Sequence, residues 1–169
     1  MKQSDFLKAV LPFKDRVFRL AKRLLISREE AEDATQELYL KLWRNKEKLA
    51  DYKNVEAFAM TMTKNYCFDK LKSKHANNLT LVHSNYREKT TELEKRIENN
   101  DSINQVHRLI EKLPKHQKII IQLRDIEQYE FDEIYKIVDM KPTAVRVALS
   151  RARKTIRREL TKKHNYGVS

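Results

Sequence analysis

The chain has 169 residues and a formal net charge of +12, so it is long enough for one domain or two small ones and favours a polyanionic partner. Its only glycine, Gly167, excludes a glycine-rich phosphate loop, and its only cysteine, Cys67, excludes an internal disulfide framework and suits a reducing cytosol. We expect no membrane insertion and no secretory signal, because no apolar run is long enough and charges interrupt the first residues.

The first part of the chain predicts helices with apolar stripes. One stripe runs over residues 6–25, and Pro12 should bend it because proline interrupts helical hydrogen bonding. Ser27 and Glu30 then have the spacing of a capping box, in which the hydroxyl caps a backbone N–H and the carboxylate reaches back. A second helix should therefore begin there and continue to about Lys48.

A third helix follows, and then the character of the chain changes. Asn54 should cap a helix over residues 54–74, whereas residues 76–101 are polar, charged and poor in core residues. We therefore predict an all-α fold with two small helical domains joined by a flexible linker. A three-to-four-helix bundle should occupy residues 1–75, and a helix-turn-helix domain should occupy residues 102–164.

The second domain should begin with two short helices. Ser102 and Gln105 form a weaker capping box for a helix that Pro114 ends, and residues 115–126 form the next helix. The helix-turn-helix should then span residues 130–160.

The last helix has two contrasting sides. Pro142 fits its first turn, where a missing N–H costs nothing. The predicted core stripe is Val145, Ala148, Leu149, Ala152 and Ile156. The opposite, basic side carries Arg146, Val147, Ser150, Arg151, Lys154, Arg157 and Arg158. A basic helix after a short turn suits the major groove of DNA. A solvated surface is the alternative for any charged face, but the near absence of acid here favours DNA binding.

The second helix also has two sides. Its predicted core side is Ala31, Ala34, Thr35, Leu38 and Leu42, and directly opposite lie Asp33, Gln36, Glu37, Leu40 and Trp43. An apolar pair beside carboxylates on the outer side is typical of a protein docking site. The residue pattern is equally compatible with a Trp43 side chain that packs against another helix of the same domain.

The third helix has a polar side with Thr61, Lys64, Asn65, Phe68, Asp69 and Lys72. Lysines around an aromatic ring suit single-stranded nucleic acid, because bases stack on the ring while lysines meet phosphates. Packing of Phe68 in the core is the simpler interpretation of the pattern alone.

Catalytic and metal sites find little support in the sequence. The histidines have no ligand spacing with one another or with Cys67, and the acids from Glu29 to Glu37 lack the Glu-x-x-His pairs of a di-iron bundle. No nucleophile has a neighbouring base. We therefore expect no metal, no cofactor and no enzymatic activity.

Three segments in this order resemble the extracytoplasmic-function (ECF) sigma factors of bacterial RNA polymerase. They are AEDATQELYLKLWRN, NVEAFAMTMTKNYCFDKLKSK and the run from LIEKLPKHQ to SRARKTIR. The resemblance covers nearly the whole chain except residues 76–101 and the last few. It implies that residues 1–75 are sigma region 2 and residues 102–164 are sigma region 4.

The resemblance also implies residue roles. Region 2 would dock on the clamp helices of the largest polymerase subunit through Asp33, Gln36, Glu37, Leu40 and Trp43. The −10 promoter element would be read by the loop over residues 50–55 and by Lys64, Asn65, Asp69 and Lys72. The −35 element would be read by Arg146, Val147, Ser150 and Arg151, with Lys154 and Arg158 nearer the DNA backbone. Further implied partners are the polymerase flap and an anti-sigma factor, which in this family is often membrane-anchored. The resemblance places the chain itself in the cytoplasm.

The chain departs from the common pattern of this family at several positions. Gln128 replaces the usual glycine before the helix-turn-helix, and bulky Tyr135 replaces a small residue. Thr143-Ala144 replaces the usual Gly-Thr at the start of the last helix.

Two other classes of function remain open at this point. An autonomous helix-turn-helix regulator would use the first domain to dimerise or to sense a signal. A pure interaction protein would act as an adaptor, although the basic last helix argues against that.

Overall fold

The computed structural model describes residues 1–78 and 102–167, and within these ranges the secondary structure is helical, without a strand. The predicted all-α class is confirmed. Apart from its first three residues, which belong to a helix, the predicted linker over 76–101 lies outside the described residues. None of the described helices is long and apolar enough to cross a membrane.

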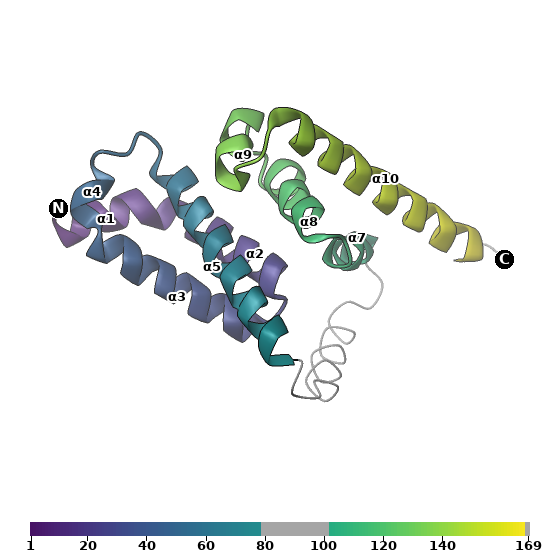
Figure 1. The fold of residues 1–169 in the computed structure, drawn as a ribbon, viewed down its shortest axis with the longest axis horizontal. Helices are drawn as coiled ribbons and strands as arrows, with labels where there is room; N and C mark the ends of the chain where they lie inside the picture. Colours follow the sequence, from purple (N-terminus) through teal and green to yellow (C-terminus); the bar gives the residue numbers. More distant parts are fainter. Residues whose placement is uncertain (79–101, 168–169) are drawn as a thin grey trace.

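The N-terminal half is built around one central helix, α2. Its elements are α1 (Gln3–Val10), η1 (Leu11–Phe13), α2 (Lys14–Leu25), α3 (Arg28–Arg44), α4 (Lys46–Leu49) and α5 (Val55–Asn78). Pro12 lies in η1, so the predicted bend is a complete break between α1 and α2. Helix α2 packs against both α3 and α5, and the buried side of α3 consists of the five predicted residues (Figure 1).

The helix starts largely follow the predicted capping. The Ser27 hydroxyl accepts the Glu30 N–H at 3.3 Å, and Asn54 Oδ1 accepts the Ala57 N–H at 3.0 Å. The Glu30 carboxylate does not reach back, however, because it forms an ion pair with Lys74 of α5. Only half of the predicted capping box is present.

The C-terminal half contains the predicted helix-turn-helix. Its elements are α7 (Ser102–Glu111), α8 (Lys115–Ile121), η2 (Gln122–Ile126), α9 (Phe131–Val138) and α10 (Pro142–Gly167). The helix predicted over 115–126 ends in a wide turn, since the Glu127 N–H donates to the Gln122 carbonyl five residues back. Asp139 has left-handed backbone angles and makes the turn between α9 and α10.

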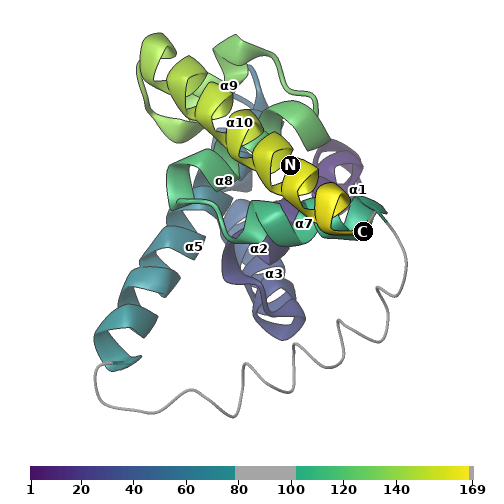
Figure 2. The same ribbon diagram turned by 90° about the vertical axis from the view of Figure 1, so that its right-hand side faces the viewer.

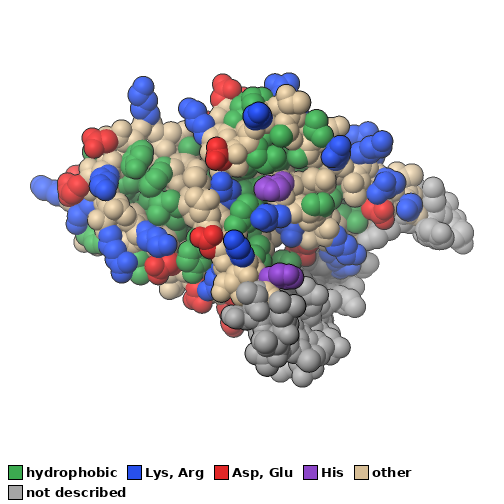
Figure 3. Space-filling view, in the orientation of Figure 1, with side chains coloured by type: hydrophobic (Ala, Val, Ile, Leu, Met, Phe, Trp, Pro, Cys, Tyr) green, Lys and Arg blue, Asp and Glu red, His purple; other side chains and the backbone are tan. Residues whose placement is uncertain are grey.

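The two halves lie against each other. Helix α5 packs along α9, and α2 packs along α8 and η2, as the two perpendicular views show (Figures 1 and 2). Lys and Arg side chains are spread over both halves of the molecular face in Figure 3. The predicted division into two domains therefore does not mean that the domains are far apart.

Candidate nucleic-acid interface

Helix α10 presents its basic side to solvent. Val145, Leu149, Ala152 and Ile156 are buried, and this stripe fixes the rotation of the helix about its axis. The residues that the sequence placed opposite are all exposed: Arg146, Val147, Ser150, Arg151, Lys154, Arg157 and Arg158. The predicted orientation of α10 is thus confirmed.

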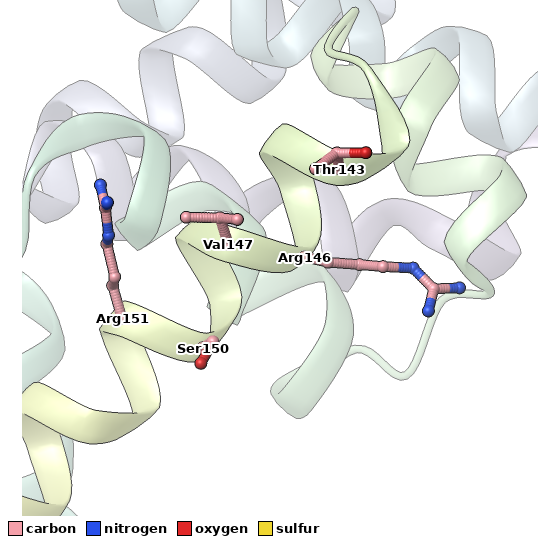
Figure 4. A pocket seen from close by; sticks show the side chains of 5 residues that line it. All are labelled: Thr143, Arg146, Val147, Ser150 and Arg151. Carbon is pink, nitrogen blue, oxygen red and sulfur yellow. The ribbon is translucent and has the colours of Figure 1, made fainter.

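A shallow hollow lies near the start of α10. Thr143, Arg146, Val147, Ser150 and Arg151 line a volume of about 390 Å³. In Figure 4 the two arginines point away from each other, with Val147 and Ser150 between them. Guanidinium and hydroxyl donors beside an apolar side chain match the acceptors and the thymine methyl group that base pairs expose in the major groove.

Helix α9 holds one of these arginines. Arg146 Nε donates to the Tyr135 hydroxyl at 3.2 Å, and the Arg146 guanidinium lies 5.0 Å from the centre of the Phe131 ring. Sequence reasoning did not predict this contact. Its only signal was the bulk of Tyr135 at a position where the family usually has a small residue.

The outer side of α3 is partly apolar and partly charged. Asp33, Gln36 and Leu40 are exposed, and Leu40 keeps 49% of its surface accessible. Glu37 and Trp43 are partly buried. The Trp43 ring meets Phe6 of α1 edge-on at 5.0 Å, and Lys46 Nζ lies 3.6 Å from the Trp43 ring centre. Trp43 therefore packs against another helix of the same domain, as one interpretation of the pattern allowed, and its side chain remains partly accessible.

A tyrosine in the loop before α5 stacks on a phenylalanine in the first turn of that helix. The Tyr52 and Phe58 rings lie 4.4 Å apart with an interplanar angle of 16°, and Tyr52 is exposed. Along α5, Asn65, Asp69 and Lys72 are exposed as predicted. An exposed aromatic ring can stack on an unpaired base, and the amide and ammonium groups further along α5 can contact the nucleic-acid backbone.

The middle of the polar side of α5 is covered by the C-terminal half. Lys64 is only 8% exposed. Burial lowers its pKa, and the charge of Asp139 in the helix-turn-helix partly offsets that effect. Phe68 meets the His116 ring edge-on, and Lys115 Nζ lies 4.3 Å from the Phe68 ring centre. The sequence suggested that Phe68 packs in a core, and it does pack, but partly against the other half of the molecule.

Other chemistry is limited in the part of the chain that the structure describes. No group of three or more His, Cys, Asp or Glu side chains there could hold a metal ion. Burial raises the pKa of the Cys67 thiol to about 12, so the thiolate is not available near neutral pH.

Comparison with known families decides which class of protein this is. The family model for Sigma-70 region 2 matches residues 10–76, and the model for Sigma-70, region 4 matches residues 103–156. The chain belongs to the sigma-70 family. Sigma factors direct bacterial RNA polymerase to promoters, so this chain binds core polymerase and promoter DNA in transcription initiation. The resemblance to ECF sigma factors is confirmed, and the autonomous regulator is not favoured.

Solved structures with the same fold span both halves of this sigma factor. The sigma factor RpoE from Bartonella quintana, in complex with the anti-sigma factor NepR, is 15% identical with a TM-score of 0.72. That match covers 93% of this chain and 97% of the other. CnrH, in complex with the cytosolic domain of CnrY, is 16% identical with a TM-score of 0.66, and the match covers 95% of this chain and 90% of the other. No curated protein sequence matches this sigma factor significantly.

Proposed function

We propose that three surfaces of this sigma factor divide the work of promoter recognition. The outer side of α3 docks on the clamp helices of the largest polymerase subunit. The exposed side of α10 reads the −35 element, and the polar side of α5 with the preceding loop reads the −10 element. Region 2 then corresponds to residues 1–75 and region 4 to residues 102–164. The chain would have no enzymatic activity of its own and would act in the cytoplasm.

The single observation that carries this proposal is the reading face of α10. Its basic side chains are all exposed opposite a buried stripe, and two arginines flank a hollow of about 390 Å³. Arg146, Val147, Ser150 and Arg151 would contact base edges. Lys154 and Arg158 lie further along the same helix, where they can neutralise phosphates.

Docking through α3 is supported by its outer apolar residue and its carboxylates. Asp33, Gln36, Glu37, Leu40 and Trp43 share one side of the helix, opposite the core. A half-exposed leucine beside a partly buried tryptophan resembles the apolar centre of a protein interface with a polar rim.

Reading of the −10 element by α5 is supported by Tyr52 and by the exposed Asn65, Asp69 and Lys72. An exposed ring that already stacks on Phe58 can accept an extruded base, whose unstacking costs a few kcal/mol. Lys64 belongs to the same side and would join the surface only when the two halves separate.

An apolar groove supports a second protein contact in region 4. It has a volume of about 480 Å³ between α7, η2 and α10, and Ile103 at its edge is 61% exposed. We propose that this groove receives the polymerase flap. By analogy with RpoE and CnrH, we also propose that an anti-sigma factor controls this chain.

Reconstitution with bacterial core polymerase tests the assignment. The purified chain should co-purify with core polymerase and should support run-off transcription from a promoter of its own organism, whereas core polymerase alone should not. A chain that binds promoter DNA but neither binds core polymerase nor supports transcription would contradict the proposal.

A further inference from the structure

Arginines of α2 form a cluster of polar contacts across the boundary between the two halves. Two nitrogens of the Arg19 guanidinium donate to the Glu127 carboxylate, Nε to Oε1 at 2.5 Å and NH2 to Oε2 at 2.8 Å. The Glu127 side chain is only 2% exposed, although it carries a charge. Two parallel charge-assisted N–H···O bonds from one guanidinium to a carboxylate fix the relative orientation of the two side chains, and removal of one partner leaves a charge that has lost its partner.

A second group of contacts lies beside the first. Arg16 forms an ion pair with Glu56 at the start of α5, and its Nε lies 3.8 Å from Glu127 Oε2. The hydroxyl of buried Tyr129 donates to the same Glu56 at 3.0 Å. Side chains of α2 and α5 therefore meet two residues of the segment between η2 and α9.

The backbone between Glu127 and Tyr129 is itself unusual. Gln128 has a φ of 62°, in the left-handed region that favours glycine and costs other residues about 1 kcal/mol or more. This conformation occurs between the two residues that reach the N-terminal half. Backbone hydrogen bonds within the C-terminal half define this turn, because the Glu127 N–H donates to the Gln122 carbonyl and the Tyr129 N–H donates to the Leu123 carbonyl, both at 3.0 Å. The turn presents the Glu127 and Tyr129 side chains to α2 and α5.

A third arginine of α2 forms buried hydrogen bonds between the two halves. Arg23 is buried, its Nε donates to Gln122 Oε1 at 2.8 Å, and its NH1 donates to the His107 carbonyl at 3.3 Å. Desolvation lowers the pKa of Arg23, and Glu111 partly offsets this effect. A guanidinium with this burial is stabilised by acceptors from the C-terminal half.

We propose that Arg16, Arg19 and Arg23, with Glu127, Tyr129 and Gln122, form a clasp that keeps this sigma factor closed. In the closed form α9 and α8 cover Lys64 and Phe68 of α5. Promoter binding through α5 then requires release of the clasp. This consequence for promoter binding rests on the proposed role of α5, whereas the closed form itself does not.

A charge exchange across the clasp tests the proposal. Arg19→Glu and Glu127→Arg each place like charges opposite each other, and the double variant restores an opposite pair. Small-angle X-ray scattering should show an expanded free chain for each single variant and a compact chain for the double variant. Arg28→Glu is the matched control, because Arg28 pairs with Glu32 within α3 at 3.2 Å and should stay compact. Circular dichroism should show the same helix content in all four variants.

A milder variant keeps the test decisive if a charge reversal unfolds the chain. Arg19→Gln removes the ion pair without adding an opposed charge, and it should expand the chain at lower salt than wild type. Single variants that stay as compact as wild type at every salt concentration would overturn the clasp.

A fluorescent single-stranded DNA probe measures the consequence for α5. If the closed form predominates about 10:1, Arg19→Glu should bind the probe about tenfold more tightly, because a closed receptor loses affinity in proportion to its open fraction. Lys64→Met, combined with Arg19→Glu, should remove most of that gain in affinity for the probe. Expansion without any gain in binding would leave the clasp intact and overturn the role of α5, whereas a compact Arg19→Glu would overturn the clasp.

Discussion

The two surfaces proposed to read promoter DNA differ in how the fold presents them. The basic side of α10 faces solvent because a buried stripe on the same helix fixes its rotation. The polar side of α5 also lies opposite a core, yet α9 and α8 cover its middle. One surface depends only on its own helix and domain. The other depends on where the second domain lies, so its availability can be regulated.

The largest expected effect comes from a change on the outer side of α3, which is proposed to bring both promoter-reading surfaces to the polymerase. Leu40→Asp places a charge at the centre of the outer side of α3, where 49% of Leu40 is exposed. Binding to core polymerase should weaken by about 3 kcal/mol or more, on the order of a hundredfold. A pull-down with core polymerase measures the loss, and thermal melting should show an unchanged fold.

Ile26→Asp is the matched control for that variant. Ile26 is 38% exposed, precedes α3 and lies outside the proposed docking surface, so this variant should bind core polymerase normally. Trp43→Ala is a poorer probe, because loss of its contact with Phe6 should also cost about 0.5–1.5 kcal/mol of stability. Equal loss of binding in Leu40→Asp and Ile26→Asp would argue against a docking site on α3.

Variants on the exposed side of α10 should distinguish residues that read bases from residues that contact phosphates. Arg151→Ala should cost about 1–3 kcal/mol at the −35 element and relax base preference at one position. Lys154→Ala should weaken binding evenly across sequences and lower the salt slope by about one unit. Fluorescence anisotropy on matched duplexes over a range of salt distinguishes the two. The account would fail if Arg151→Ala lost affinity without any change in base preference.

A smaller effect should follow from loosening Arg146. Tyr135→Phe removes the hydroxyl that accepts from Arg146 Nε and keeps the rings of α9. Affinity for the −35 element should fall by about 0.5–1.5 kcal/mol, with stability nearly unchanged. Arg146→Ala combined with Tyr135→Phe should be no worse than Arg146→Ala alone. Additive losses in this cycle would show that Tyr135 acts independently of Arg146.

The smallest expected effect is a change with pH in the equilibrium between the closed and open forms, through Lys64 on the covered side of α5. Burial lowers the pKa of Lys64 below its ordinary 10.5, so the closed form holds fewer protons than the open form in the window just below that value. Rising pH should therefore favour closure there. The Lys64→Met variant should lose this pH dependence of closure and otherwise behave like wild type. Scattering curves from pH 8 to pH 10 compare the two chains, and identical pH responses would contradict burial of a titrating Lys64.

The fold within each half could be predicted from the sequence because its signals are local. Pro12, Ser27, Asn54 and Pro142 mark where helices break or begin, and the stripes of α3 and α10 give the correct buried sides. The break of α10 from α9 at residues 139–141 follows from the same kind of signal. Contacts within a few residues decide all of these features.

The contact between the halves could not be predicted in this way. Arg19 and Glu127 are 108 residues apart, and nothing in the periodicity of α2 marks its arginines for a carboxylate in the other half. The burial of Lys64 and the packing of Phe68 on His116 depend on the same long-range contact. The only local hint was Gln128 at a usual glycine position, and the structure gives it the positive φ that a glycine would adopt easily.

Selection of bound sequences from a random DNA library, with and without core polymerase, tests the account most directly. With core polymerase, wild type should enrich two sequence blocks at a fixed spacing, and Arg146→Ala with Arg151→Ala should lose only the upstream block. The free chain should enrich at most the block that α10 reads, because its α5 surface is covered. Two blocks enriched by the free chain, or none enriched by the holoenzyme, would contradict the account.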